Sequence, residues 1–346
     1  MVIDVWMPLL VPLLAVPLVR LLADRLAPRP ASWLLAATGA LLSGCTMLAL
    51  GLLTGAGVLR LGSVASAEHL SPLLLRRMSP TPLPLAWAAG IALAVAVGLA
   101  GWTLHRRITT LLLAAKTAPT RRGGLAVLPD DLPDAYAVPG RPGTVVVTTG
   151  MLRALDSRER EVLLAHERAH LSGRHHWFTL VMDVAAVMHP ALIALRAPLR
   201  YHLERWADES AADAVGDRRL AARAIARAAL AGGRAGSGVA PAGTFSATAG
   251  PVPRRVAALL TAPAARRSRL LPGMAAALVA CVALSGGGAL DAATDLRGSM
   301  EAVEVHRHHR PETAGTVLAA ARAGRAADVR QRTPSQIRLP SPARTQ

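Results

Sequence analysis

The chain contains little cysteine, little lysine and few aromatic residues. Its two cysteines, Cys45 and Cys281, both lie inside apolar runs, which excludes a disulfide framework and disfavours cysteine as a zinc ligand. The only lysine is Lys116, so the formal net charge of +17 comes almost entirely from arginine. Aromatic residues make up 3% of a chain that is 52% hydrophobic, because the apolar mass is leucine, alanine and valine gathered into long runs. This composition is typical of a membrane protein rather than of a water-soluble core.

A strongly basic chain has nucleic acid or a membrane surface as its natural partner. No nucleic-acid recognition motif accompanies the charge, and the arginines gather beside the apolar runs. We therefore expect the lipid bilayer as a partner and no direct binding of nucleic acid.

Four apolar runs each come close to the ~20 residues that a membrane-spanning helix requires. They cover about residues 5–22, 33–53, 83–104 and 270–290. The first run has no basic segment before it and no clear small-residue cleavage site, so we interpret it as a transmembrane helix and not as a removed signal peptide.

Arginine placement predicts the orientation of these helices, since basic residues concentrate in cytoplasmic flanks. Clusters follow the first run, follow the third and precede the fourth, and all three lie on one side in a four-helix topology. Arg60, Arg76 and Arg77 in the second loop conflict mildly with it. The peptide segment between the third and fourth helices is then cytoplasmic, and both termini are extracytoplasmic. The expected organisation is transmembrane helices in 1–104, a cytoplasmic domain in 105–269, a transmembrane helix in 270–290 and a polar, disordered tail in 291–346.

The cytoplasmic segment opens with a predicted hairpin and a capped helix. Residues 135–138 and 144–149 are β-rich and flank a Pro/Gly turn. Asp156, with Glu159 three residues later, is the pattern of a capping box at a helix start. A further apolar run, 177–195, is interrupted by polar residues and by Pro190, and we expect a buried or membrane-dipping helical hairpin there.

The sequence His166-Glu167-Arg168-Ala169-His170 carries the clearest chemistry. Side chains at positions i and i+4 of a helix share one face, so both imidazoles can reach a single zinc ion. Glu167 stands beside the first histidine and can act as general base toward a water molecule that the metal activates. It can then return the proton to the leaving amine of a peptide. The alternative is an exposed helix face that carries two histidines without a metal.

A third ligand is available downstream, because catalytic zinc sites of this type commonly add a carboxylate. Glu204 lies on a predicted helix over about 199–215, and Asp208 follows it at i+4 on the same face. Asp208 could orient a ligand histidine through its other ring nitrogen. The alternative is a solvated acidic face, since Glu209 and Asp213 follow.

Together these residues resemble the membrane gluzincin peptidases, in particular the M56 family of antirepressor-type proteases and, more distantly, the M48 family. Both families pair a His-Glu-x-x-His helix with a later Glu-x-x-x-Asp helix, as in 166–170 and 204–208. The resemblance implies a mainly α membrane protein, with four transmembrane helices and a cytoplasmic α+β gluzincin-type zinc peptidase domain. It implies Zn²⁺ as cofactor. It also implies that an edge strand holds the substrate backbone by strand addition, and the residues of that strand are Ala135, Tyr136, Ala137 and Val138.

The sequence departs from the family pattern at Arg168, where an apolar residue is common, and at His175 and His176, where a polar or acidic residue is common. A structural role for the two histidines is favoured over metal binding or substrate steering. A histidine cluster in the tail, 304–309, is favoured as solvated rather than metal-binding.

Three functions are consistent with these motifs and this resemblance. The first is a zinc endopeptidase in regulated proteolysis, with a cytoplasmic, winged-helix transcriptional repressor as protein substrate. The second is a housekeeping protease for membrane protein quality control, and the third is a non-catalytic membrane scaffold or receptor. Covalent binding of β-lactams is not expected, because the sensor domain of related proteins needs lysines in two motifs and Lys116 precedes the catalytic helix.

The arginine pattern predicts the membrane topology. A reporter fused after Arg122 is expected to behave as cytoplasmic, and one fused near Pro311 as extracytoplasmic, because the basic clusters stay on the cytoplasmic side. Paired activity measurements with a cytoplasmic and an exported reporter test this. An external signal from the Arg122 fusion would invert the topology and remove cytoplasmic proteins from the possible substrates.

Overall fold

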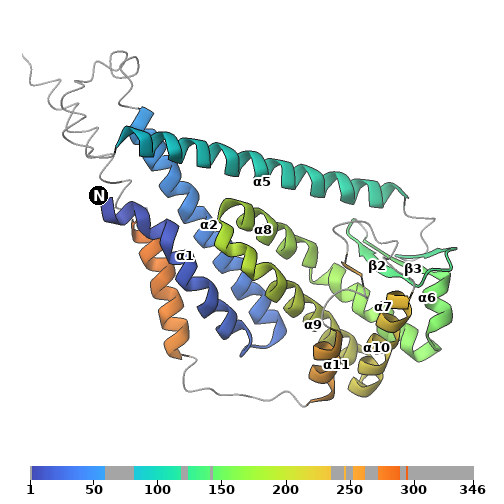
Figure 1. Ribbon diagram of the computed structural model, residues 1–346. Helices are drawn as coiled ribbons and strands as arrows, with labels where there is room; N and C mark the ends of the chain where they lie inside the picture. The colour runs from blue at the N-terminus through green and yellow to red at the C-terminus, as the bar shows by residue number, and fades with distance from the viewer. Residues whose placement is uncertain are drawn as a thin grey trace, which may run out of the picture.

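The structure is a computed structural model, and it describes residues 2–58, 82–117, 124–140, 143–234, 245–246, 252–261, 272–288 and 294. Figure 1 shows a mainly helical molecule with long helices at one end and a small sheet with shorter helices at the other. The expected tail, 291–346, and its histidine cluster lie outside the described residues, apart from residue 294.

Three helices in the described part of the chain are long and apolar enough to cross a bilayer, so the chain is a membrane protein with several candidate spans. They are α1 (Val2–Ala23), α2 (Pro28–Val58) and α5 (Leu83–Thr117). The helix Pro272–Gly288, where we expected a fourth span, is apolar but shorter than the ~20 residues of a typical crossing. It packs on the same apolar core as α1 through Leu278. The described residues thus contain three candidate spans, and a fourth crossing stays a proposal.

Proline shapes α1 and its contact with α2. Pro12 has no N–H group, so the carbonyl of Pro8 one turn earlier loses its helical donor. The hydroxyl of Thr46 on α2 donates a hydrogen bond to that carbonyl at 3.0 Å. The pair satisfies a polar group that would otherwise stay unpaired inside an apolar bundle.

The small sheet is mixed and has the strand order β1-β3-β2-β4. Its strands are β1 (Leu125–Leu128), β2 (Ala135–Val138), β3 (Thr144–Thr148) and β4 (Phe245–Ser246). β3 runs parallel to β1 and antiparallel to β2, which confirms the expected hairpin. Successive side chains point to opposite faces of the sheet. Accordingly Ala135 packs in the cluster that contains residues of the helices Thr149–Ala154 (α6) and Ser157–Ser172 (α7). Tyr136 packs in the cluster that contains Ala114 of α5.

The expectation that β2 is an edge strand is wrong for the described sheet. β2 has β3 on one side and β4 on the other, with Tyr136 opposite Ser246 and Ala137 opposite Phe245. β4 comes from a stretch rich in glycine, alanine and serine that carries no strand pattern. A segment of the same chain therefore takes the place that we expected an added substrate strand to take.

The remaining helices surround the sheet and connect it to the long helices. Their bounds are α6 (Thr149–Ala154), α7 (Ser157–Ser172), α8 (His175–Met188), the 3₁₀ helix η1 (Pro190–Leu195), α9 (Arg196–Val215), α10 (Arg218–Arg234) and α11 (Val252–Leu260). The expected capping box begins α7: the Glu159 N–H donates to Asp156 Oδ1 at 2.9 Å, and the Asp156 N–H donates to Glu159 Oε2 at 3.0 Å. The apolar run 177–195 lies in α8 and η1, with a break at Pro190, and one face of it packs in a core with α1 and α2.

One carboxylate ties three helices together near the start of α9. Asp183 of α8 is 6% exposed and forms ion pairs with Arg107 of α5 and with Arg196 of α9. One carboxylate thus pairs with two arginines that come from different helices. The ion pairs therefore fix how α5 and α9 sit against α8.

Asp183→Asn is expected to lower stability by about 1–3 kcal/mol, since it leaves two partly buried guanidinium groups without their anion. Thermal unfolding of the purified protein in detergent measures the effect. Asp131→Asn is the matched control, because Asp131 and its partner Arg153 are both exposed and such pairs contribute about 0–1 kcal/mol. Equal midpoints for the two variants would show that Asp183 does not clamp these helices.

Candidate metal centre

Two helices bring three ligand atoms to one point. His166 and His170 lie one turn apart on α7, and Glu204 approaches from α9. The two Nε2 atoms are 3.1 Å apart, and each lies 3.7 Å from a carboxylate oxygen of Glu204. All three side chains are buried. The structure thus brings together the three residues that the sequence suggested as metal ligands.

The donor set fits Zn²⁺. Zinc binds imidazole nitrogen and carboxylate oxygen at ~2.0–2.2 Å, and two nitrogens at tetrahedral positions around it are about 3.3 Å apart. The observed spacing of the two Nε2 atoms, 3.1 Å, is close to this value. Two histidines and one glutamate form a typical ligand set of catalytic zinc, in which three protein ligands leave a position open for water or substrate.

The second ring nitrogen of each histidine is also held. His166 Nδ1 lies 3.1 Å from Asp208 Oδ1, and His170 Nδ1 lies 2.7 Å from His175 Nδ1. Such contacts fix the orientation of a ligand ring and keep Nε2 aimed at the metal position. A Cβ atom at Gly173 would lie 2.5 Å from His175 Nε2, so glycine there permits the close approach of His175. His175 thus touches a ligand histidine, whereas His176 lies outside the site and lines a separate cavity.

Arg255 is a part of the site that the motif search missed. It lies on α11, is 1% exposed, and donates two hydrogen bonds to Asp208: Nε to Oδ2 at 2.8 Å and Nη2 to Oδ1 at 2.6 Å. Its Nη1 lies 2.8 Å from Glu204 Oε2. One guanidinium group therefore holds Asp208 in the bidentate geometry that arginine favours and also pairs with Glu204.

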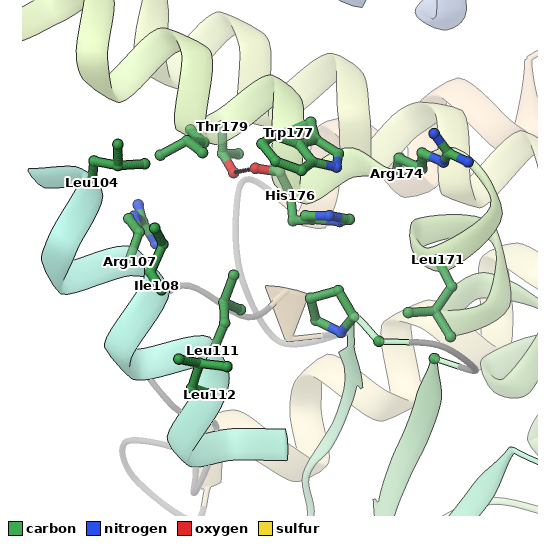
Figure 2. A pocket seen from close by; sticks show the side chains of 14 residues that line it. Leu104, Arg107, Ile108, Leu111, Leu112, Leu171, Arg174, His176, Trp177 and Thr179 are labelled. Atoms are coloured by element: carbon green, nitrogen blue, oxygen red, sulfur yellow. Dashed lines mark hydrogen bonds between the residues drawn. The ribbon is translucent and has the colours of Figure 1, made fainter. Parts of the chain in front are cut away.

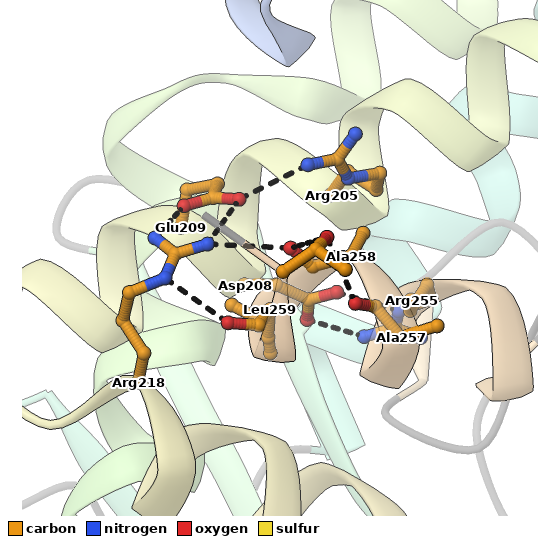
Figure 3. Close-up of polar contacts among 9 residues, drawn as sticks. Arg205, Asp208, Glu209, Arg218, Arg255, Ala257, Ala258 and Leu259 are labelled. Carbon is orange, nitrogen blue, oxygen red and sulfur yellow. Dashed lines mark hydrogen bonds and ion pairs between the residues drawn. The ribbon is translucent and has the colours of Figure 1, made fainter. Parts of the chain in front are cut away.

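A second arginine, Arg218, fixes the C-terminal end of α11, the helix that carries Arg255. Arg218 forms ion pairs with Glu209 and donates to the carbonyl oxygens of Leu259 at 3.1 Å and Ala258 at 3.4 Å (Figure 3). Cations are favourable at the C-terminal end of a helix, where carbonyl groups lack helical partners. Glu209, at the surface beside Asp208, thus anchors α11 and lies outside the metal site.

Among the described residues, Glu167 has neither a hydrogen bond nor an ion pair, whereas Glu204 and Asp208 are both paired with Arg255. Glu167 is 0% exposed, and both of its oxygens lack a hydrogen-bond partner. Burial, with added repulsion from Glu204 and Asp134, raises the pKa of Glu167 to about 8, although His166 and Arg255 pull it down. A carboxylate with a pKa near neutrality can both accept and return a proton at physiological pH.

The two ligand histidines differ in proton affinity. Burial lowers the pKa of His166, but Asp208 and Glu204 outweigh it and raise the value to about 10. Burial and the neighbouring cations hold the pKa of His170 well below its usual range. A proton on His166 must leave before zinc can bind, so zinc affinity rises with pH. Burial also raises the pKa of Asp208, but the bonds from Arg255 and His166 lower it further, so Asp208 stays an anion.

Comparisons with known proteins find that the segment containing the motif helix is similar to a peptidase family. Residues 102–200 match the model of Peptidase family M48. Over 94 residues the chain is 35% identical to a Protease HtpX homolog of Pyrococcus furiosus, covering 27% of this chain and 30% of that protein. It is 36% identical over 77 residues to a homolog of the same name from Desulforapulum autotrophicum, covering 22% and 24%. The chain spans less than a third of the length of these curated relatives.

These matches support the M48 family, the more distant of the two resemblances in the sequence, and give no support to M56. The matched segment contains the His-Glu-x-x-His motif but ends before Glu204. The third ligand and Arg255 therefore rest on the geometry of the site.

Asp208→Asn is expected to weaken zinc affinity by roughly 10–100-fold, since it removes the anion that orients His166 and leaves Arg255 without its main partner. Competition with a zinc chelator measures the affinity. Asp213→Asn is the matched control, because Asp213 is an exposed aspartate of the same helix and lies outside the metal site. Asp208 would return to the status of an ordinary ion-pair residue if the two variants bound zinc equally.

Proposed function

We propose that this chain is a membrane-anchored zinc endopeptidase of the M48 type, with His166, His170 and Glu204 as metal ligands and Glu167 as general base. The observation that carries the proposal is the convergence of three buried ligand atoms beside a buried carboxylate that has no hydrogen bond of its own. The match of residues 102–200 to the M48 model supports it. We further propose, from the arginine pattern, that the site faces the cytoplasm.

The site residues divide the chemistry of peptide hydrolysis among them. Zn²⁺ held there would supply a Lewis acid and bring the pKa of water to near 7. Glu167 accepts the proton of the attacking water and then donates it to the leaving amine. Asp208 and His175 keep the two ligand rings aligned. Arg255 supplies one positive charge to Glu204 and Asp208, which reduces the repulsion between these two buried carboxylates.

The substrate backbone is proposed to pair with β2, through residues 135–138. β2 packs against α7, which carries the catalytic motif. Since β4 occupies the outer side of β2, a substrate strand has to replace β4 before it can pair there. β4 has only two residues, so few backbone hydrogen bonds oppose the exchange.

A role in membrane protein quality control fits the comparisons better than cleavage of a transcriptional repressor. The repressor role followed from the M56 resemblance alone, whereas the matched relatives are named as proteases of the HtpX type. The proposed substrates are accordingly membrane proteins. A non-catalytic scaffold is disfavoured, because a scaffold has no need of a buried carboxylate beside two buried histidines.

Glu167→Gln and Glu204→Gln are expected to fail in different ways. Glu167→Gln keeps the three ligands but removes the base, so zinc should stay near one equivalent while peptide cleavage falls by at least ~10²–10⁴. Glu204→Gln replaces an anionic ligand with a weak neutral one, so zinc and activity should be lost together. Metal analysis beside a cleavage assay on the purified variants measures both.

Circular dichroism of each variant serves as the folding control. Full activity of Glu167→Gln would overturn the peptidase proposal. Full zinc content of Glu204→Gln would move the third ligand elsewhere and leave the peptidase proposal standing.

A further inference from the structure

A cavity of about 700 Å³ lies between α5, the turn that joins β2 to β3, and the start of α8. Figure 2 shows Leu104, Ile108 and Leu112 along α5, facing His176 and Trp177 across the opening. None of the proposed metal ligands lines it. The cavity is therefore distinct from the metal centre and belongs to the junction between the longest candidate span and the sheet.

Apolar side chains at helical spacing form the α5 wall of the cavity. Leu104, Ile108, Leu111 and Leu112 recur at helical spacing and line it together. The positions between them include His105, Arg106, Thr109 and Thr110. An apolar stripe facing an open cavity leaves hydrophobic surface without a protein partner among the described residues, and this surface favours an apolar occupant.

The rim of the cavity is positively charged. Arg107 and Arg174 line the cavity, no described aspartate or glutamate lines it, and the one anion paired with Arg107 is Asp183, which also pairs with Arg196. Arg174, which also lines the cavity, has no ion pair with a described carboxylate. A cavity with excess positive charge beside apolar walls complements a ligand that joins an anionic group to a hydrocarbon chain.

The position of the cavity on α5 places it at the membrane surface. The candidate span Leu83–Ala114 has 32 residues, which is about 48 Å of helix and more than the ~30 Å hydrocarbon core. The first ~20 residues suffice to cross, and Arg106 and Arg107 follow directly. Trp102 and Trp177 are 56% and 54% exposed at this level, as tryptophan often is at a membrane interface.

We propose that this cavity binds one anionic phospholipid, with its anionic headgroup attracted to the arginines that line the cavity and its acyl chain against the leucine and isoleucine side chains of α5. A peptide fits less well, because α5 and α8 bond their own backbone groups internally and would leave those of a bound peptide unpaired. A phospholipid has no backbone amides to satisfy. The proposal does not depend on peptidase activity.

Tryptophan quenching by brominated lipid tests the proposal directly, because Trp177 lines the cavity. The protein is reconstituted into phosphatidylcholine vesicles that contain phosphatidylglycerol, with bromine on the chains of either lipid at equal bromine content. Brominated phosphatidylglycerol should quench more strongly, and Trp177→Phe should abolish the difference. Trp87→Phe is the matched control, since Trp87 is equally exposed but lies on α5 away from the cavity.

Two further variants probe the rim and the wall. Arg174→Asn keeps a residue that tolerates the left-handed backbone found there, at φ 50°, but removes the charge. It should lower the preference for phosphatidylglycerol about fivefold, the effect of one arginine near a membrane surface. Leu112→Asp puts an anion on the exposed α5 wall and should expel the lipid. Arg153→Asn, at an exposed arginine elsewhere, should change nothing.

Equal quenching by the two brominated lipids would overturn the proposal, as would an unchanged preference in Arg174→Asn. Protection of Trp177 by a water-soluble apolar peptide, with no preference for phosphatidylglycerol, would instead identify a peptide groove. In either case the metal centre and its proposed chemistry would be unaffected.

Discussion

The balance of buried charge at the candidate metal centre constrains the helices around it. Glu167, Glu204 and Asp208 lie together where almost no water reaches them, and a buried carboxylate is costly unless a positive charge accompanies it. Arg255 supplies one such charge. A divalent metal supplies two more, so that arginine and metal together neutralise the three carboxylates. The requirement explains why an arginine from a distant helix is buried here, and why the site favours a divalent cation.

The metal ligands could be predicted because local geometry fixes them. His166 and His170 share a helix face by spacing alone, as do Glu204 and Asp208. Arg255 could not be found in this way, since it follows Asp208 by 47 residues and a glycine-rich stretch intervenes. The one local signal is that Val252, Arg255, Val256 and Leu259 share a helix face, which places an arginine on an apolar stripe. The position of β4 had no signal, because its pairing with β2 depends on tertiary contacts alone.

Hydropathy located the long helices but not their ends. The third apolar run ends at about residue 104, where charge begins, yet α5 continues to Thr117. Arginine marks the edge of the hydrocarbon layer and does not interrupt a helix, and no proline or helix-ending glycine follows until after Thr117. The expected boundary between membrane and water thus lies inside α5, and this one helix connects the apolar bundle to the sheet.

The order of the chain gives Arg255 a further significance during synthesis. The ribosome makes the His-Glu-x-x-His motif, Glu204 and Asp208 well before it makes α11. At ~5–20 residues per second, the 47 residues from Asp208 to Arg255 take about 2–10 seconds. Throughout that interval Glu204 and Asp208 lack the guanidinium group of Arg255, so the candidate metal centre is incomplete. Translation itself thus delays assembly of this centre until every described strand has been made.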